Sequence, residues 1–187
     1  MYIALLENVA RSLDAHNVRY MIIGGQAVLI YGEPRLTRDI DITIDGTPKQ
    51  RLAFVRDICT ELSLSIPAEA TDEFVESTYI LPAFDEATGF QLKFIFSESA
   101  YEQQAMTRTQ YISIRDYSVH YASAEDVIIH KLIANRPRDY EDIVSILKRG
   151  NNIDNEYVMQ WLAEFDKGLN TDYVRRYEQL WADTVTL

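Results

Sequence analysis

Within the segment 38–45, polar and apolar side chains alternate without a break from residue 39 onward, and this pattern constrains the fold more than any other in the chain. Side chains two residues apart on a β-strand point to the same face. Asp39 and Asp41 therefore share one face, and the isoleucines that alternate with them fall on the opposite face, which is expected to be buried. The pattern predicts a strand with core packing on one side and two neighbouring carboxylates on the other.

A short apolar run, 20–23, ends in Gly24-Gly25 shortly before the acid pair. Two carboxylates this close repel each other unless a cation lies between them. Oxygen ligands suit Mg²⁺, which is commonly held by one or two carboxylates together with the phosphates of a substrate. Glycines beside the pair allow backbone to approach such phosphates, since no Cβ is in the way. The pattern favours a divalent-metal site, although an Asp-x-Asp on a strand is also found as a solvated face.

Composition limits the class of protein. At 187 residues the chain is expected to form one domain, or one domain with a helical appendage. The single cysteine, Cys59, excludes an internal disulfide and fits a reducing compartment, so a cytoplasmic location is predicted. No run approaches the length of a membrane-spanning helix, and no membrane partner is expected. The formal charge of −11 disfavours non-specific binding to nucleic acid.

The periodicities predict a mixed α+β fold, with a sheet of about four or five strands flanked by helices. Residues 1–122 are expected to form the α/β core, and residues 123–187 a C-terminal helical lobe packed on it. Strands are predicted at 20–23, 38–45, 78–84 and 90–96, and 111–114 and 119–121 are set apart from them as short β segments. Helices are predicted at 3–15, 26–31, 48–62, 98–107, 123–133, 137–148, 157–165 and 173–181.

The motifs together resemble a known family. Gly24-Gly25-Gln26-Ala27, Gly32, Arg35, Thr37 and Asp39-Ile40-Asp41 are similar to the signature of the nucleotidyltransferase superfamily with the DNA polymerase beta-like fold. Ser123 to Asp139, which contains Lys131, Arg136 and Arg138, resembles the minimal bacterial branch that includes the AbiEii-type toxins. The combined spacing of a glycine pair, an acid pair and a distant basic helix is specific, whereas a lone Asp-x-Asp is not.

The resemblance implies an activity and a site. The substrate would be a nucleoside triphosphate (NTP), whose nucleoside monophosphate passes to a hydroxyl of an unidentified protein, RNA or small molecule. Asp39 and Asp41 would be catalytic and hold Mg²⁺. An antitoxin or a second copy of the chain is a possible partner. The residues expected to border the nucleotide cleft are Gly24, Gly25, Arg35, Thr37, Lys131, Arg138 and Asp139.

The chain departs from the family pattern at Lys93. A third carboxylate normally completes the site from a neighbouring strand, but segment 90–96 has Lys93 at that position. Its ammonium is expected within salt-bridging reach of Asp39 or Asp41, where it would neutralise the pair and compete with a metal. Mg²⁺ binding is therefore expected to be weak or absent if Lys93 occupies the site.

Alternative interpretations remain for several residues. Lys131 is equally consistent with a surface lysine, and Asp139 with a cap of the helix that follows Pro137. Three functions are compatible with the sequence. The chain is an active nucleotidyltransferase, a nucleotide- or partner-binding relative in which Lys93 impairs catalysis, or a toxin–antitoxin or phage-defence component that acts by protein contact.

Overall fold

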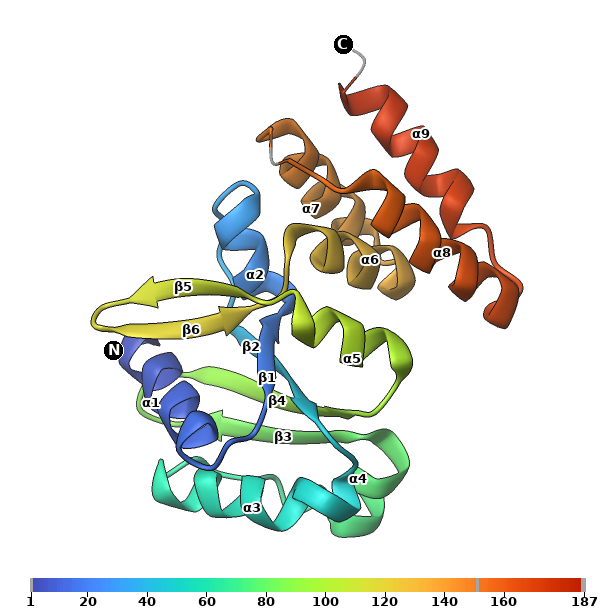
Figure 1. The fold of residues 1–187 in the computed structure, drawn as a ribbon. Coiled ribbons are helices and arrows are strands. Elements are labelled where there is room, and N and C mark those ends of the chain that lie inside the picture. The colour runs from blue at the N-terminus through green and yellow to red at the C-terminus, as the bar shows by residue number, and fades with distance from the viewer. Residues whose placement is uncertain (1, 151, 186–187) are drawn as a thin grey trace. The chain divides into compact units, whose positions relative to one another are not determined.

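The structure, a computed structural model, describes residues 2–150 and 152–185. Residues 1, 151, 186 and 187 of the two predicted domains lie outside this description. The chain divides into two compact units. Unit 1 consists of Met1–Gln26 and Thr37–Tyr121, and unit 2 consists of Ala27–Leu36 and Ala122–Leu187. Figure 1 shows the elements of both.

Unit 1 is built on one mixed sheet with the strand order β3-β4-β2-β1-β6-β5. β2 is central, because it pairs antiparallel with β1 and parallel with β4. The strands are β1 (Tyr20–Ile23), β2 (Asp39–Asp45), β3 (Ile80–Asp85), β4 (Phe90–Ser97), β5 (Gln110–Ile114) and β6 (Tyr117–Tyr121). The helices are α1 (Tyr2–Ala15), the start of α2 (Gly24–Tyr31), α3 (Pro48–Glu61), α4 (Asp72–Thr78) and α5 (Ala100–Thr107).

Side chains along the central strands alternate between the buried core and the face that carries the acid pair. Ile40, Ile42 and Ile44 of β2 are fully buried, as the sequence pattern predicts. Phe94 of β4 is likewise fully buried beside them in the same register. The acids of β2 are only half-buried, so this strand joins the core to a polar face. Thr43 is the exception, because it lies on the acid-bearing side of the alternation and is nevertheless fully buried.

Unit 2 is helical. It contains the end of α2 and the helices α6 (Ala124–Ala134), α7 (Pro137–Lys148), α8 (Asn155–Leu169) and α9 (Tyr173–Val185). Ser123 caps α6, since its hydroxyl accepts a hydrogen bond from the Asp126 backbone N–H. Asp126 is buried and accepts a further bond from the Tyr157 hydroxyl of α8, at 2.7 Å. This bond links two helices of the unit through a fully buried carboxylate.

The predicted mixed α+β class, with helices flanking a sheet and a helical C-terminal part, is confirmed. The predicted number of strands is wrong, since the described residues form a six-stranded sheet. The hairpin of β5 and β6 joins the sheet through a short parallel contact between β6 and β1. That pairing links strands far apart in the sequence, so local pattern does not reveal it.

Helix α4 is absent from the sequence prediction, which begins a strand at residue 78. The helix has a recognisable start, because the Thr71 hydroxyl accepts a hydrogen bond from the Phe74 backbone N–H. It buries only one residue, Val75, so it carries no apolar period. It ends through Tyr79 in the left-handed conformation (φ 59°), and β3 therefore begins at Ile80.

Candidate active site

The acid pair projects from the central strand of unit 1. Asp41 lies between Ile23 of β1 and Lys93 of β4 in the sheet register, and Asp39 lies beside Gln91. The Asp39 side chain is 47% exposed and the Asp41 side chain 21%. Neither carboxylate is in apolar core, and the alternation of β2 puts both on one face. The pair is therefore open to a ligand.

Gly24 permits a close approach between α2 and Asp41. It adopts φ +64°, and a Cβ at this position would lie 2.2 Å from Asp41 Oδ2. No side chain fits there without displacing the carboxylate. Gly25, the next residue, is buried in the first turn of the same helix.

Gln26 fixes the start of β2. Its side-chain Nε2 donates a hydrogen bond to the Asp39 carbonyl at 3.1 Å. The side chain is almost fully buried, at 2% exposure. Gln26 belongs to the motif identified in the sequence, but no role was predicted for it. Its position could have indicated one, because a polar side chain directly after the glycine pair interrupts an apolar helix.

Lys93 lies against both acids. Its Nζ is 3.6 Å from Asp39 Oδ2 and 3.7 Å from Asp41 Oδ1. The parallel register pairs Lys93 with Asp41 directly, which is the arrangement the alternation of β4 predicts. One ammonium thus neutralises part of a two-carboxylate charge. The Lys93 side chain is 39% exposed, so water screens its interactions with the two acids. The flexible side chain can therefore move away from the carboxylates.

The donor set suits a metal held together with a substrate. The described residues contain no group of three or more His, Cys, Asp or Glu side chains arranged to hold a metal ion. Two carboxylates remain, which is the number that Mg²⁺ takes when substrate phosphates supply further oxygens. The residues therefore fit Mg²⁺ bound with a nucleotide, provided that Lys93 gives way, and do not form a metal cage by themselves.

A second set of predicted residues meets inside unit 2. Arg35 binds Asp142 through two hydrogen bonds, at 2.7 and 2.9 Å. The Lys131 ammonium lies 2.7 Å from both Asp139 and Asp142. Asp139 also accepts a hydrogen bond from the Arg136 backbone N–H, so it caps α7 as one of the sequence interpretations proposed. This buried cluster joins α6, α7 and the segment that follows α2.

Electrostatics within this cluster favour the charged forms. Burial alone would raise the pKa of Asp142, but hydrogen bonds and charges from Arg35 and Lys131 outweigh burial and hold that pKa below its ordinary value. Sequence reasoning missed Asp142. It lies three residues after Asp139 on α7 and therefore on the same side of the helix, which is the signal that was available.

The remaining predicted residues belong to neither set of contacts. Thr37 is half-buried just before β2, and Arg138 is exposed in the first turn of α7. Arg35, Lys131, Arg138 and Asp139 are in unit 2, whereas the acid pair is in unit 1. The common cleft that the sequence predicts for these residues stays a prediction.

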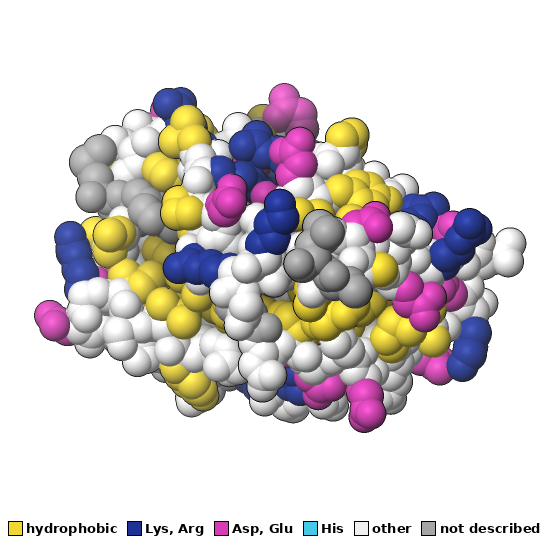
Figure 2. All heavy atoms as spheres, turned by 90° about the horizontal axis from the view of Figure 1, so that it is seen from above, with side chains coloured by type: hydrophobic (Ala, Val, Ile, Leu, Met, Phe, Trp, Pro, Cys, Tyr) yellow, Lys and Arg dark blue, Asp and Glu magenta, His cyan; other side chains and the backbone are white. Residues whose placement is uncertain are grey.

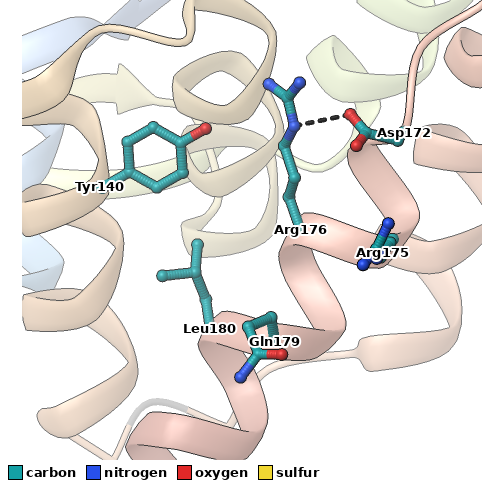
Figure 3. A pocket seen from close by; sticks show the side chains of 6 residues that line it. All are labelled: Tyr140, Asp172, Arg175, Arg176, Gln179 and Leu180. Atoms are coloured by element: carbon teal, nitrogen blue, oxygen red, sulfur yellow. Dashed lines mark ion pairs between the residues drawn. The ribbon is translucent and has the colours of Figure 1, made fainter.

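The surface has no uniform charge on the face drawn in Figure 2, where basic and acidic side chains are intermingled with apolar ones. Unit 2 contains a shallow hollow of about 340 Å³ between α7 and α9 (Figure 3). Arg176 lines it and is held by Asp172 at 2.6 Å. None of the predicted site residues lines this hollow.

No helix in the described part of the chain is long and apolar enough to cross a membrane.

Three of the solved structures that are similar to this chain illustrate the likeness. The antibiotic-resistance factor ANT(2'')-Ia is 20% identical, with a TM-score of 0.62, over 90% of this chain and 93% of that one. A nucleotidyltransferase-like protein from Paracoccidioides brasiliensis is 15% identical, with a TM-score of 0.53, over 89% and 87%. The lincosamide antibiotic adenylyltransferase LnuA is 18% identical, with a TM-score of 0.51, over 72% and 89%. At these identities the likeness shows the fold alone.

No curated protein sequence matches the chain. A family model described as nucleotidyl transferase AbiEii toxin, type IV toxin–antitoxin system, matches residues 5–180. That span includes the glycine pair, the acid pair, Lys93 and the buried cluster of unit 2. The chain therefore belongs to the nucleotidyltransferase AbiEii toxin family.

Proposed function

We propose that the protein binds a nucleoside triphosphate at the acid-bearing face of β2 and transfers its nucleoside monophosphate to an acceptor hydroxyl. The observation that carries this proposal is the close packing of Asp41 against Gly24, with Asp39 on the same face. A glycine with positive φ at a helix start allows backbone donors near the acids to approach phosphate oxygens. Membership of a nucleotidyltransferase family supports the same reaction class.

Asp39 and Asp41 would hold Mg²⁺ together with the triphosphate. The metal would supply positive charge at the phosphates and favour departure of pyrophosphate. The protein's own contribution is to fix the two carboxylates, since β2 is held by hydrogen-bonded neighbours on both sides. Gln26 adds a hydrogen bond at the end of β2 that carries Asp39. Preorganised charge of this kind costs little rearrangement when the nucleotide binds.

Lys93 sets the conditions for activity. Its ammonium already compensates the acid pair, so a metal has to displace it. Mg²⁺ affinity without nucleotide is therefore expected to be low. Once displaced, Lys93 is a cationic donor next to the site, and a triphosphate is a suitable acceptor for it. We expect Mg²⁺ and nucleotide to bind together rather than in sequence.

The acceptor is proposed only by class. It is a hydroxyl on a protein, an RNA or a small molecule. ANT(2'')-Ia is solved in complex with adenylyl-2''-tobramycin, and LnuA is bound to lincomycin. Those proteins share the fold, whereas the family model that matches this chain is described as a toxin of a type IV toxin–antitoxin system. We propose an antitoxin partner from that description, and a cytoplasmic location from the single cysteine.

A second candidate function is favoured by Lys93 itself. If its ammonium stays with the acids, the protein binds nucleotide or a partner without transferring a nucleoside monophosphate. The two functions differ in one measurement, which is incorporation of label from an α-phosphate-labelled nucleotide. Binding without incorporation at saturating Mg²⁺ would favour the second.

The experiment is a transfer assay with each common nucleoside triphosphate, labelled at the α-phosphate, with and without Mg²⁺. Total protein, RNA and small metabolites from a bacterial extract serve as acceptors. We expect Mg²⁺-dependent labelling by the natural protein, and Asp41→Asn should reduce it by about a hundredfold or more. Asp57→Asn is the matched control, because Asp57 is exposed on α3. Equal labelling by both variants would contradict the proposed site.

A further inference from the structure

Gly32 belongs to the motif identified in the sequence, but it makes no contact with the acid pair that would explain it. It directly follows α2 and is buried. A Cβ at this position would lie 2.3 Å from Ser145 Oγ of α7, which is closer than Cβ atoms in proteins approach other atoms. The next nearest atoms, of Ile146 and Val28, would be 3.3 Å away. Residue 32 therefore lacks a side chain because the Ser145 hydroxyl occupies the space.

The Ser145 hydroxyl is held at this position by two hydrogen bonds. It accepts one from the Glu33 backbone N–H at 3.2 Å and donates one to the Asp142 carbonyl of its own helix at 2.8 Å. Turning the hydroxyl away from residue 32 would leave the Glu33 N–H without this acceptor, which carries a cost. Ser145 thus links α7 to the chain that leaves α2.

Arg149, the C-cap residue of α7, binds the end of α2. Its Nη1 donates hydrogen bonds to the Gly32 carbonyl at 2.8 Å and to the Ile30 carbonyl at 3.3 Å. The last carbonyls of a helix have no partner within the helix, and a cation beside them also interacts favourably with the helix dipole. The end of α2 is therefore capped by a side chain from another helix.

Three side chains of α7 and its C-cap hold residues 30–35, named the exit segment here. Asp142, Ser145 and Arg149 are spaced by three and then four residues, so they lie on one side of the helix. They bind the exit segment in reverse order, with Arg149 at its start and Asp142 at its end, through Arg35. The contacts form one continuous polar stripe within unit 2.

The exit segment lies, along the chain, between the two parts of the site. It follows α2, whose first residue, Gly24, packs against Asp41, and it leads to Asp39 at the start of β2. Residues 33–38 form neither helix nor strand, so side-chain contacts replace the backbone ladder that fixes regular elements. Asp39 is the more exposed acid, at 47%, and its placement depends on the backbone that precedes it.

We propose that Ser145 and Arg149 are positioning residues of the nucleotide site and act by holding the exit segment. They do not contact the nucleotide. They restrict the chain between the glycine pair and the acid pair, so that less freedom is lost when the nucleotide binds. This inference rests on the proposed function, since it requires a nucleotide at the acid pair.

Nucleotide affinity tests the role of Arg149. The probe is the α,β-methylene analogue of each nucleoside triphosphate with Mg²⁺, which cannot release pyrophosphate, titrated by calorimetry. Arg149→Ala should raise the Kd by about fivefold or more, and Arg149→Lys, which keeps a cation, should restore most of the affinity. Lys148→Ala is the matched control, because Lys148 is the exposed neighbour. A purely structural role would instead lower the melting temperature and the binding stoichiometry and leave the Kd unchanged.

A double-mutant cycle tests the close contact of Gly32 with Ser145. Gly32→Ala should weaken nucleotide binding by about tenfold, because the new Cβ displaces the Ser145 hydroxyl and with it the exit segment. In the double variant with Ser145→Ala the hydroxyl is absent, so the double variant should bind more tightly than Gly32→Ala alone.

Two results would overturn the proposal while leaving the proposed function intact. They are additive losses in the cycle, and an Arg149→Ala variant whose Kd equals that of Lys148→Ala. A natural protein that binds none of the four analogues would overturn the proposed function, and this inference with it.

Discussion

At the scale of single residues, the charge balance around β2 determines how readily the acid pair can bind a metal ion. Two carboxylates face one ammonium, and none of the three is fully buried. Coulomb interactions between such exposed groups are screened, so the Lys93 contacts restrain the site without locking it. A divalent ion carries twice the charge of the ammonium and competes for the same oxygens. Lys93 is therefore the residue whose replacement is most informative.

We predict that Lys93→Asp increases Mg²⁺ affinity by about tenfold or more, equivalent to about 1.4 kcal/mol. The change removes the competing ammonium and adds a third oxygen ligand. Without metal the variant should unfold at a lower temperature than the natural protein, because three like charges then lie together. Mg²⁺ should restore its stability. Isothermal titration and thermal unfolding measure the two effects.

Lys93→Ala separates the loss of the competing ammonium from the gain of an oxygen ligand, since it removes the ammonium but adds no ligand. Its Mg²⁺ affinity should lie between those of the natural protein and Lys93→Asp. Lys49→Ala, which removes an exposed lysine of α3, should leave the affinity unchanged. Unaltered Mg²⁺ binding in both Lys93 variants would show that Lys93 does not compete for the acids.

We predict that Gly24→Ala destabilises the fold by about 2 kcal/mol or more and displaces Asp41. The added Cβ would lie 2.2 Å from Asp41 Oδ2, and alanine is strained at φ +64°. Gly89→Ala is the control, because Gly89 has a similar φ of +73° but open space around its Cβ position. Urea unfolding should show a clearly larger loss for Gly24→Ala. Equal losses would mean that the conformation, and not the contact with Asp41, accounts for the effect.

Sequence alone predicted part of this geometry. The period of two in β2 and β4 was enough to bring Lys93 toward the acids, because parallel neighbours in register share a face. The sequence could not predict that Arg35 binds Asp142, since that contact joins segments more than a hundred residues apart. Nor could it predict that Lys131 is almost fully buried, because burial depends on how helices pack.

At the scale of elements, the buried cluster of unit 2 connects helices through charge. Lys131 comes from α6, both of its acids come from α7, and Arg35 comes from the segment after α2. Paired buried charges add little net stability compared with apolar packing, but removing one partner is costly. The cluster therefore fixes which residues of α6 and α7 face each other.

We predict that stability at acid pH depends on Asp142. Its folded-state pKa is lowered, mainly because bonds from Arg35 and Lys131 outweigh burial. Its contribution is therefore present above the unfolded-state pKa, about 3.9, and is lost as pH falls through the folded-state value. Asp142→Asn should cost about 2 kcal/mol at neutral pH, and the gap to the natural protein should close below about pH 4.

Chemical denaturation at several pH values measures this gap. Glu141→Gln is the matched control, because Glu141 is the exposed neighbour on the same helix. It should change stability little at any pH. A gap between the natural protein and Asp142→Asn that persists to the lowest pH would show that the charge of Asp142 contributes nothing to folding.

Elements with a strong period were predictable and those without one were not. β2 has a complete alternation, and its predicted and observed bounds differ by a single residue. α8 extends beyond its prediction at both ends, since Asp154 caps it and Asn170 ends it in the left-handed conformation. α4 has a cap but only one buried residue, so the sequence carries too little pattern to reveal it.

At the scale of the whole molecule, net charge limits the partners. The formal charge is −11, and the face in Figure 2 shows no continuous basic surface. Binding to nucleic acid gains most of its non-specific affinity from counterions that lysine and arginine release. Several of the chain's cations are already engaged in ion pairs, including Arg19, Arg35 and Lys131. Any RNA acceptor would therefore have to be recognised at a local site rather than attracted by overall charge.

We predict that the protein binds a random single-stranded RNA more weakly than about 100 µM at physiological salt. Affinity should change little between about 50 and about 200 mM NaCl, because few counterions are released. Fluorescence anisotropy with a labelled oligonucleotide measures both quantities, and an unrelated basic protein provides the positive control. Adding Mg²⁺ and a nucleoside triphosphate should not create general RNA affinity, since these ligands neutralise the site without adding a basic surface. Micromolar binding with a steep salt dependence would contradict this expectation and make a direct nucleic-acid acceptor the leading candidate.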